Sequence, residues 1–228
     1  MSRRLVVTID GPSGAGKSTA GRALARKLGY VFLDTGAMYR ALALKALRTR
    51  TPLDAEGALA ELARGTRIEL AGSGDVVTLD GEDVSAAIRT REVSAAASRV
   101  SRHPQVRRLM VSRQQELGRP GGVVLDGRDV GTVVFPDADV KFYLDADARR
   151  RAERRHAELA AAGVASDVDA IEREIRARDH ADSTRSDSPL TRAPDAIYLD
   201  TTVLGPGEVV ERMAGAVQEK LRASRPDS

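Results

Sequence analysis

The chain has 228 residues, of which 42% are apolar and 30% are charged, and its formal net charge is +3. This balance is typical of a globular protein. The chain has no cysteine, which excludes disulfides and thiolate-bound metals, and its three histidines are too scattered to predict a histidine metal site. No apolar run is long enough to span a bilayer, and the stretch before Asp10 is too short for a signal peptide, so we expect a cytoplasmic protein.

Most of the positive charge is carried by arginine, because lysine occurs only five times. The planar arginine fork suits phosphate and carboxylate groups. A GC-rich genome, whose codons favour arginine, would produce the same composition. Composition alone therefore does not tell whether the arginines bind phosphate or reflect codon usage, and their positions in the chain have to decide.

The first predicted elements flank a glycine-rich loop. Residues 5–9 are short, β-branched and mostly apolar, which predicts a buried parallel strand, and residues 18–28 have helical spacing. Residues 11–18 between them read Gly-Pro-Ser-Gly-Ala-Gly-Lys-Ser and fit the phosphate-binding pattern G-x-x-x-x-G-K-[ST]. Glycines let backbone N–H groups approach a phosphate chain, Lys17 can reach the β- and γ-phosphates, and Ser18 can ligate Mg²⁺. The strand before and the helix after the motif argue against a chance match, so we predict a nucleoside triphosphate site.

The next elements suggest a second anion site. Residues 31–33 predict a strand and residues 36–47 a helix, and the segment 34–40 across their junction reads Asp-Thr-Gly-Ala-Met-Tyr-Arg. A strand end, a helix start and an arginine in the first turn form a site for an anion beside the first one. A simply capped helix with a solvated Arg40 is the alternative, and this segment alone does not decide.

The pattern then becomes antiparallel. Residues 67–70 and 76–79 flank the glycine-rich residues 71–75, which predicts a β-hairpin with a loose turn, and residues 80–83 predict another turn toward Val84. We therefore expect a small antiparallel insert within an otherwise alternating strand–helix pattern.

Beyond the insert the alternating pattern resumes. Short buried strands alternating with helices predict an α/β fold, a doubly wound parallel sheet of five strands with inserted lobes. The remaining segments are helices at 92–99, 105–117, 147–162, 168–181 and 207–221, and strands at 122–125, 140–144 and 196–199.

The two polar helices before the last strand carry most of the informative charge. Arg151 and Arg155, one turn apart in an arginine run, predict a mobile lid that closes over the triphosphate and excludes water. A solvated face on which glutamates offset these arginines is the alternative. Arg178, Asp182 and Arg185 are spaced i, i+4 and i+7 and would share one helix face, either as a ladder of weak ion pairs or as phosphate-binding arginines.

The predicted third strand separates the classes of nucleotide-binding protein. It runs into Asp-Gly-Arg-Asp at residues 126–129, not into the Asp-Glu pair of an ATPase motor, and no guanine-reading Asn-Lys-x-Asp segment occurs in the chain. An acidic residue followed closely by arginine suits a protein that must hold a second phosphorylated molecule.

Together these segments resemble the bacterial cytidylate kinases, which belong to the nucleoside monophosphate kinase group of P-loop proteins. The resemblance runs from residue 9 to about residue 200, and Gly127-Arg128-Asp129 and the hairpin insert are its specific parts. The insert distinguishes the bacterial enzymes from shorter uridylate–cytidylate kinases. The matching segments are 9–19, 34–40, 81–85, 88–90, 96–98, 126–136 and 178–179.

The resemblance implies transfer of the γ-phosphoryl group of ATP to CMP or dCMP, with Mg²⁺ and without a covalent enzyme intermediate. Catalytic roles are expected for Lys17, Arg128, Arg178 and Arg185, and a Mg²⁺ contact for Ser18, where some relatives carry glycine. The expected ATP-binding residues are Gly11, Pro12, Ser13, Gly14, Ala15, Gly16, Lys17, Ser18, Thr19, Arg151 and Arg155. The implied CMP-binding residues are Thr35 (serine in some relatives), Tyr39, Arg40, Ser98, Arg107, Arg128, Asp129, Arg178, Asp182 and Arg185.

Within this set the resemblance implies distinct tasks. Ser98 and Asp129 would accept hydrogen bonds from the edge of cytosine, including its amine. Uracil lacks this amine, so binding of UMP would leave a buried acceptor of the pocket without a partner. Arg128 and Arg185 would grip the acceptor phosphate, Arg178 would act at the transferring group, and Asp182 would reach the sugar.

The expected organisation is a core with two lobes. The P-loop core comprises residues 1–34, 118–146 and 186–228, the monophosphate-binding region residues 35–117 with the β insert at about 63–103, and the helical lid residues 147–185. We expect a monomer whose partners are nucleotides, without nucleic acid or membrane. A kinase for another small acceptor, such as UMP, AMP or shikimate, is the alternative, and a nucleic-acid-binding P-loop protein is disfavoured by the 3% aromatic content.

Overall fold

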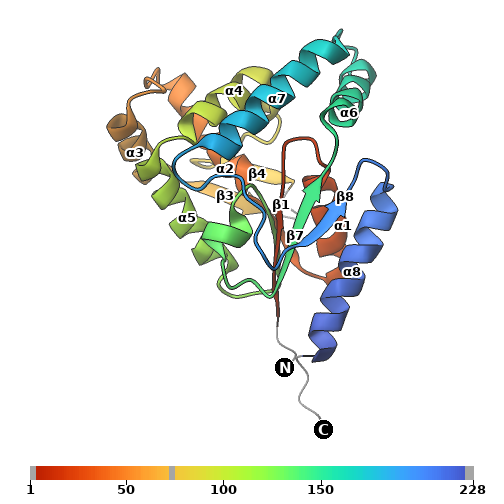
Figure 1. The fold of residues 1–228 in the computed structure, drawn as a ribbon. Helices are drawn as coiled ribbons and strands as arrows, with labels where there is room; N and C mark the ends of the chain where they lie inside the picture. The colour runs from red at the N-terminus through yellow and green to blue at the C-terminus, as the bar shows by residue number, and fades with distance from the viewer. Residues whose placement is uncertain (1–3, 72–74, 224–228) are drawn as a thin grey trace.

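The structure, a computed structural model, describes residues 4–71 and 75–223. Figure 1 shows a central sheet with α1 and α8 along one side, the helices α2 to α5 on the other, and α6 and α7 above it. In these described ranges the central sheet has five strands in the order β2-β6-β1-β7-β8, and every neighbouring pair is parallel. The expected doubly wound sheet is confirmed.

Each strand of this sheet ends in aspartate. Because parallel strands point the same way, their carboxyl ends meet at one edge, the edge where ligands bind in open α/β sheets. The pairing register brings Ile9 and Asp34 level with Asp126 on the strand between them. The strands are β1 (Val6–Asp10), β2 (Val31–Asp34), β6 (Val123–Asp126), β7 (Val140–Asp145) and β8 (Ile197–Asp200).

Helices cover both faces of this sheet. On one face α1 (Lys17–Leu28) and α8 (Pro206–Ala223) pack on the alternate side chains Val7, Ile9, Phe142 and Leu144. The other face packs against α5 (Pro104–Gly118) and a π-helical turn, η2 (Val130–Val134). Sequence analysis did not predict this π-helical turn.

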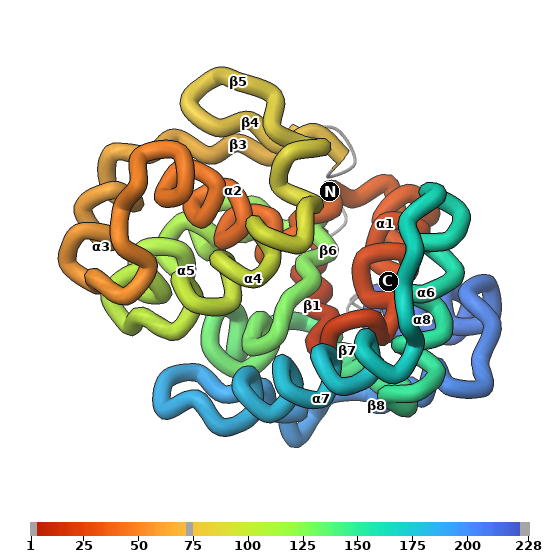
Figure 2. The backbone as a smooth tube through the Cα atoms, turned by 90° about the horizontal axis from the view of Figure 1, so that it is seen from above, coloured from red at the N-terminus to blue at the C-terminus, as the bar shows by residue number. Residues whose placement is uncertain are grey.

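A second core lies beside the sheet. It is built by α2 (Thr35–Arg48), α3 (Glu56–Arg64), α4 (Arg91–Val100) and part of α5, and Figure 2 shows these helices gathered on one side of the molecule. Sequence analysis assigned no element to residues 56–64, yet Leu59 and Ala63 of α3 are fully buried in this core. The spacing of Leu59, Leu62 and Ala63, at i, i+3 and i+4, is helical, but the helix has only 9 residues and its pattern is short.

The small sheet next to this core has the expected hairpin. β3 (Ile68–Ala71) pairs antiparallel with β4 (Val76–Leu79), while residues 72–74 of the expected loose turn lie outside the described residues. Of the turn expected at 80–83, only Asp80 and Gly81 have positive φ, of 52° and 90°. The other two residues form β5 (Glu82–Asp83), which pairs with β4 and leads into a short 3-10 turn, η1 (Ala87–Arg89).

The two polar helices are α6 (Ala148–Ala161) and α7 (Val168–Thr184), as expected, and charge pairs connect them. Arg149 of α6 pairs with Asp169 and, at 3.3 Å, with Glu172 of α7. One expectation here is wrong, because Arg185 does not lie on α7 but follows it in extended conformation, with φ −63° and ψ 142°. The hydroxyls of Ser183 and Thr184 bond the carbonyl of His180 at 3.1 and 2.7 Å, and such bonds compete with helical ones at this end.

Gly21 sets the distance between α1 and the sheet, and it provides a test of this packing. A Cβ at this position would lie 2.6 Å from Phe32 Cε2 and 3.1 Å from Ile9 Cδ1. Alanine is the better helix former by about 1 kcal/mol, but overpacking a core costs about 1–3 kcal/mol. We expect Gly21→Ala to lower the midpoint of thermal unfolding. The matched control is Gly215→Ala in α8, where a Cβ meets nothing within 4 Å, and which should raise the midpoint. A stabilised Gly21→Ala protein would contradict the packing described here.

Candidate active site

The loop between β1 and α1 has the geometry of an anion cradle. Gly11, Gly14 and Gly16 have φ of 142°, 80° and 85°, and a Cβ on Gly11 would lie 1.9 Å from the carbonyl oxygen of Leu144. Only glycine fits such a backbone without strain. α1 starts with no acidic residue in its first turn and no side-chain cap, so its first N–H groups are available to an anion. All of the expected loop residues, 11–19, lie in this cradle and the first turn of α1.

Lys17 lies buried inside the cradle, where its Nζ donates to the carbonyl of Pro12 at 2.7 Å. Burial lowers the pKa of Lys17, and the nearby charge of Arg128 lowers it further, while Asp126 acts in the opposite direction. A buried cation next to another cation is stabilised by bringing in negative charge. A phosphate chain in the cradle would supply that charge.

Asp126, at the end of β6, faces the same place. Its Oδ2 accepts a hydrogen bond from the Ser18 hydroxyl at 2.5 Å. Its Oδ1 is buried and has no hydrogen-bond partner among the described residues. Burial raises the pKa of Asp126, and the charge of Asp34 raises it further. A desolvated carboxylate with one unsatisfied oxygen fits a hard cation.

These two side chains can therefore hold Mg²⁺. Mg²⁺ prefers oxygen ligands and is usually bound through one or two protein groups together with substrate phosphates. Ser18 and Asp126 provide such a pair of oxygens beside the cradle. Sequence analysis named Ser18 but gave Asp126 no metal role. The signal that could have found it is its position, an acidic residue directly after a buried strand.

A cluster of arginines lies next to the cradle. Arg178 is largely buried, its Nε has no hydrogen-bond partner among the described residues, and its pKa is lowered to about 10, first by burial and then by Arg128. Arg128 donates from Nε to Asp182 Oδ2 at 3.0 Å. The positive charge of Arg128 lowers the pKa of both Lys17 and Arg178, so the three side chains lie close together. Asp182 offsets part of this charge, because it pairs with Arg128 and its charge acts on Arg178 in the opposite direction.

A second part of the cluster surrounds Asp129. The carboxylate of Asp129 pairs with Arg107 through Oδ2 and with Arg185 through Oδ1, the latter at 3.6 Å. The guanidinium of Arg107 lies over the ring of Tyr39, 5.8 Å from its centroid. Burial raises the pKa of Tyr39 to about 12, so its hydroxyl stays protonated. Asp129, Arg107 and Arg185 all have buried side chains, and the structure brings these three together.

Three further residues that sequence analysis assigned to the monophosphate pocket, Thr35, Arg40 and Ser98, lie at the start of α2 and on α4. Asp34 is the N-cap of α2, accepting from Ala37 N at 2.9 Å, and it also pairs with Arg40 at 2.8 Å. Arg40 is therefore not simply solvated. Thr35 donates to the carbonyl of Asp126 at 2.7 Å. Ser98 lies half-buried on α4, next to the buried residues Ala96 and Ala97.

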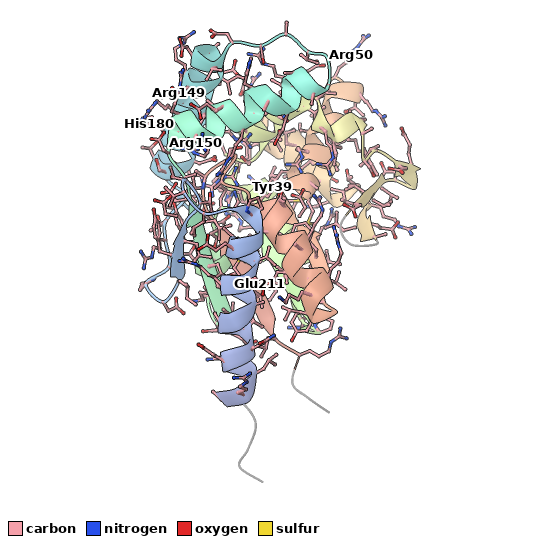
Figure 3. All side chains as sticks on the ribbon, turned by 90° about the vertical axis from the view of Figure 1, so that its right-hand side faces the viewer. Tyr39, Arg50, Arg149, Arg150, His180 and Glu211 are labelled. Atoms are coloured by element: carbon pink, nitrogen blue, oxygen red, sulfur yellow. The ribbon has the colours of Figure 1, made fainter. Side chains whose placement is uncertain are left out.

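Arg151 and Arg155, the two arginines of α6 that sequence analysis assigned to a lid, have different environments. Arg151 is buried and donates to the carbonyls of Ser13 at 2.9 Å and Ala146 at 2.8 Å, and it pairs with Asp179 at 2.7 Å. Arg155 is exposed and pairs with Glu158 at 2.9 Å, as in the alternative of a solvated helix face. Figure 3 shows Arg149 and Arg150 on α6 and His180 on α7 at the top of the molecule, with Tyr39 below them.

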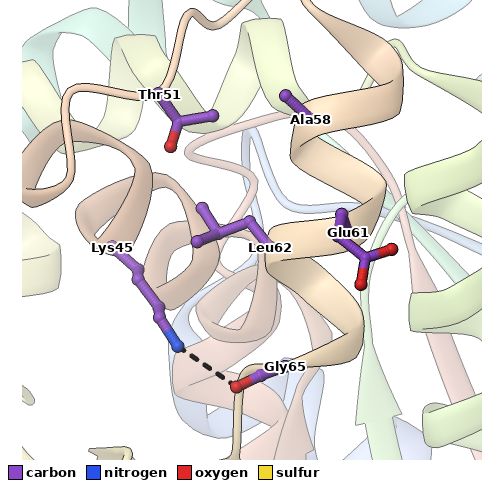
Figure 4. A pocket seen from close by; sticks show the side chains of 6 residues that line it. All are labelled: Lys45, Thr51, Ala58, Glu61, Leu62 and Gly65. Atoms are coloured by element: carbon purple, nitrogen blue, oxygen red, sulfur yellow. Dashed lines mark hydrogen bonds between the residues drawn. The ribbon is translucent and has the colours of Figure 1, made fainter.

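A separate hollow of about 440 Å³ lies between α2 and α3, lined by Lys45, Thr51, Ala58, Glu61, Leu62 and Gly65 (Figure 4). Within it Lys45 donates to the carbonyl of Gly65 at 3.3 Å. The hollow shares no residue with the cradle or the arginine cluster. No helix in the described ranges is both long enough and apolar enough to cross a membrane.

The sequence pattern of the family described as cytidylate kinase matches residues 7–219. Three relatives named cytidylate kinase align over nearly all of both chains. The one from Geobacillus sp. is 48% identical, covering 97% of this chain and 100% of the relative. The one from Syntrophotalea carbinolica is 49% identical, covering 99% of this chain and 97% of the relative. The one from Pasteurella multocida is 48% identical, covering 97% of this chain and 98% of the relative. The chain therefore belongs to the cytidylate kinase family.

Proposed function

We propose that the chain transfers the γ-phosphoryl group of ATP to CMP or dCMP, giving ADP and the nucleoside diphosphate. The observation that carries this proposal is the close approach of Lys17 in the glycine cradle to Arg128 and Arg178 of the arginine cluster. Three neighbouring cations, with an unsatisfied donor among them, fit two phosphate groups that meet there. Membership of the cytidylate kinase family supports the same reaction.

On the donor side, residues 11–19 bind the phosphates of ATP. The backbone N–H groups of the cradle and of the start of α1 hold the phosphate chain, and Lys17 reaches its outer end. Arg151 already holds the lid against the cradle through Ser13. Arg155 lies one turn further along α6 and turns toward ATP when the lid closes, leaving Glu158.

On the acceptor side, Arg128 and Arg185 bind the phosphate of CMP and Asp182 reaches its sugar. Ser98 and Asp129 accept hydrogen bonds from the cytosine edge, and Arg107 holds Asp129 in place. The other residues of the pocket are Thr35, Tyr39 and Arg40. Because the pocket offers acceptors to an amine that uracil lacks, CMP should be favoured over UMP.

The reaction needs positioning and charge stabilisation. An oxygen of the CMP phosphate forms a bond to the γ-phosphorus while the bond from that phosphorus to the bridging oxygen breaks, and ADP leaves with the electron pair. The attacking phosphate is ionised near pH 7, since its second pKa is about 6, so no general base is required. Lys17 and Arg178 stabilise the charge on the transferring group.

Mg²⁺, held by Ser18 and Asp126, would neutralise charge on the phosphates of ATP. Closure of α6 and α7 excludes water, which would otherwise accept the phosphoryl group. We further expect a cytoplasmic monomer that acts on free nucleotides. The direct test is a coupled assay of ADP formation with CMP, dCMP, UMP, AMP and shikimate in turn. Turnover with CMP and dCMP that is no higher than with the other acceptors would reject the proposal.

Arg178 should act mainly on turnover. Removing a donor aimed at developing charge typically costs about 10²–10³-fold in kcat, so we expect Arg178→Ala to lower kcat by about that factor while KM for CMP and ATP changes little. The matched control is Arg176→Ala on the same helix, because Arg176 is exposed and pairs with Glu172 at 2.7 Å. Steady-state kinetics check this, and an unchanged kcat with a raised KM would contradict the role.

Asp129 should determine base selectivity. In Asp129→Asn the amide can turn a donor toward the cytosine amine, so we expect kcat/KM for CMP to fall by about 10–100-fold and that for UMP to fall much less. The measurement is the ratio of kcat/KM for the two acceptors. A ratio equal to that of the unmodified chain would rule out base reading by Asp129.

Asp126 should determine the requirement for Mg²⁺. Asp126→Asn removes the charge beside Ser18 while keeping the size of the side chain, so we expect a higher Mg²⁺ concentration for half-maximal activity. The control is Asp145→Asn, at the end of β7, whose carboxylate bonds the N–H of Ala146 at 2.8 Å. A Mg²⁺ titration that is the same for Asp126→Asn and the unmodified chain would argue against this site.

A further inference from the structure

The turn that follows Arg128 and Asp129 is unusual. It is π-helical over Val130–Val134, and the carbonyl of Asp129 accepts from Val133 N at 2.8 Å and from Val134 N at 3.3 Å. Asp129 occupies the N-cap position of this turn, yet its side chain makes no capping hydrogen bond. Aspartate at an N-cap usually accepts from the backbone N–H groups just ahead of it. In this turn a different residue satisfies them.

That residue is Asp10, at the end of β1. Its Oδ1 accepts from Val130 N at 2.8 Å and its Oδ2 from Gly131 N at 2.7 Å, across about 120 residues of sequence. Asp10 is only 4% exposed. A Cβ on Gly131 would lie 2.8 Å from Thr8 Oγ1 and 3.2 Å from Asp10 Oδ2, so the turn packs directly on the end of β1.

One carboxylate that accepts two backbone hydrogen bonds is an effective cap. Burial raises the pKa of Asp10 to about 6, while the bonds from Gly131 and Val130 lower it. The carboxylate is therefore ionised near pH 7.5, and both oxygens can accept. Bonds from N–H groups to a charged acceptor are stronger than neutral ones.

The cap leaves the carboxylate of Asp129 available for other partners, which are Arg107 and Arg185. We propose that Asp10 is a positioning residue that caps this turn from a different strand, and so keeps Asp129 turned toward the acceptor base. The inference rests on the proposed function, because it takes Asp129 to read the base. Without Asp10, Asp129 would be drawn to cap its own turn and would turn away from the base.

The effect should be confined to the acceptor, although Asp10 directly precedes the ATP-binding loop. The cradle is held by other contacts, in which Lys17 bonds the carbonyl of Pro12, Arg151 that of Ser13, and Thr201 that of Ala15 at 3.0 Å. The side chain of Asp10 takes part in none of these. The charge of Asp10 does act on Lys17, but more weakly than that of Asp126. A change in this side chain should therefore affect ATP binding much less than CMP binding.

The experiment is Asp10→Asn, which keeps the size of the side chain but turns an amide N–H₂ toward one of the two N–H groups. We expect KM for CMP to rise about tenfold or more, the preference for CMP over UMP to fall, and KM for ATP to stay within about twofold. The matched control is Asp139→Asn, because Asp139 also accepts a backbone N–H of β1, from Val6 at 2.9 Å, but at the opposite end of the strand. The control should leave both KM values unchanged.

A double-mutant cycle separates positioning from a general structural effect. If Asp10 acts through Asp129, Asp10→Asn should change KM for CMP less than about twofold when Asp129→Asn is already present. Effects of the two substitutions that simply multiply would overturn the inference. Equal rises in KM for ATP and CMP in Asp10→Asn would overturn it as well.

Two further measurements keep the test decisive. Hydrogen exchange of the Val130 and Gly131 amides in the nucleotide-free protein should speed up in Asp10→Asn, and unchanged protection would disprove the cap whatever the acceptor is.

Should Asp10→Asn fail to fold, Gly131→Ala displaces the turn from the carboxylate and should give the same pattern, a raised KM for CMP with little change in KM for ATP. Should the unmodified chain prefer another acceptor to CMP, the proposed function fails, and the cycle is then run with that acceptor.

Discussion

The structure depends on a concentration of like charge that its own side chains only partly compensate. Lys17, Arg128 and Arg178 lie close together, and burial and the charge of Arg128 lower the pKa of both Lys17 and Arg178. Asp182 and Asp126 offset part of this charge. In the proposed reaction the phosphate groups of the two nucleotides would supply the rest, so that binding energy and transition-state stabilisation would have the same electrostatic origin.

The parallel sheet makes this arrangement possible. Carboxyl ends of adjacent strands meet at one edge, so residues far apart in sequence, such as Asp10, Asp34 and Asp126, become neighbours there. Each of these carboxylates then has a separate task. Asp34 caps α2 and pairs with Arg40, Asp126 faces Ser18, and Asp10 caps the turn after Asp129. Because Asp10 caps the turn, the carboxylate of Asp129 remains available to pair with Arg107 and Arg185.

Two separate cores explain why the donor and acceptor regions can be built independently. The core under α1 and α8 supports the cradle, whereas the core of α2, α3, α4 and α5 supports Ser98, Arg107 and Tyr39. Helices α6 and α7 lie over both regions, since α7 carries Arg178 and Asp182 and contacts α6, whose Arg151 touches the cradle. The lid closure that we propose for these two helices would therefore align two phosphates without repacking either core.

The sequence by itself determined the strands of the central sheet, most helices, the hairpin and the glycine cradle, because periodicity and the G-x-x-x-x-G-K-[ST] spacing are local properties. Only the tertiary structure decided the partners of the charged residues. It placed Arg185 beyond the end of α7, distinguished buried Arg151 from exposed Arg155, and joined Asp10 to Gly131. Helix α3 escaped sequence analysis although Leu59, Leu62 and Ala63 have helical spacing, because a helix of 9 residues gives only a short pattern. Pairing across 120 residues depends on which strand ends lie side by side, and no local pattern records that.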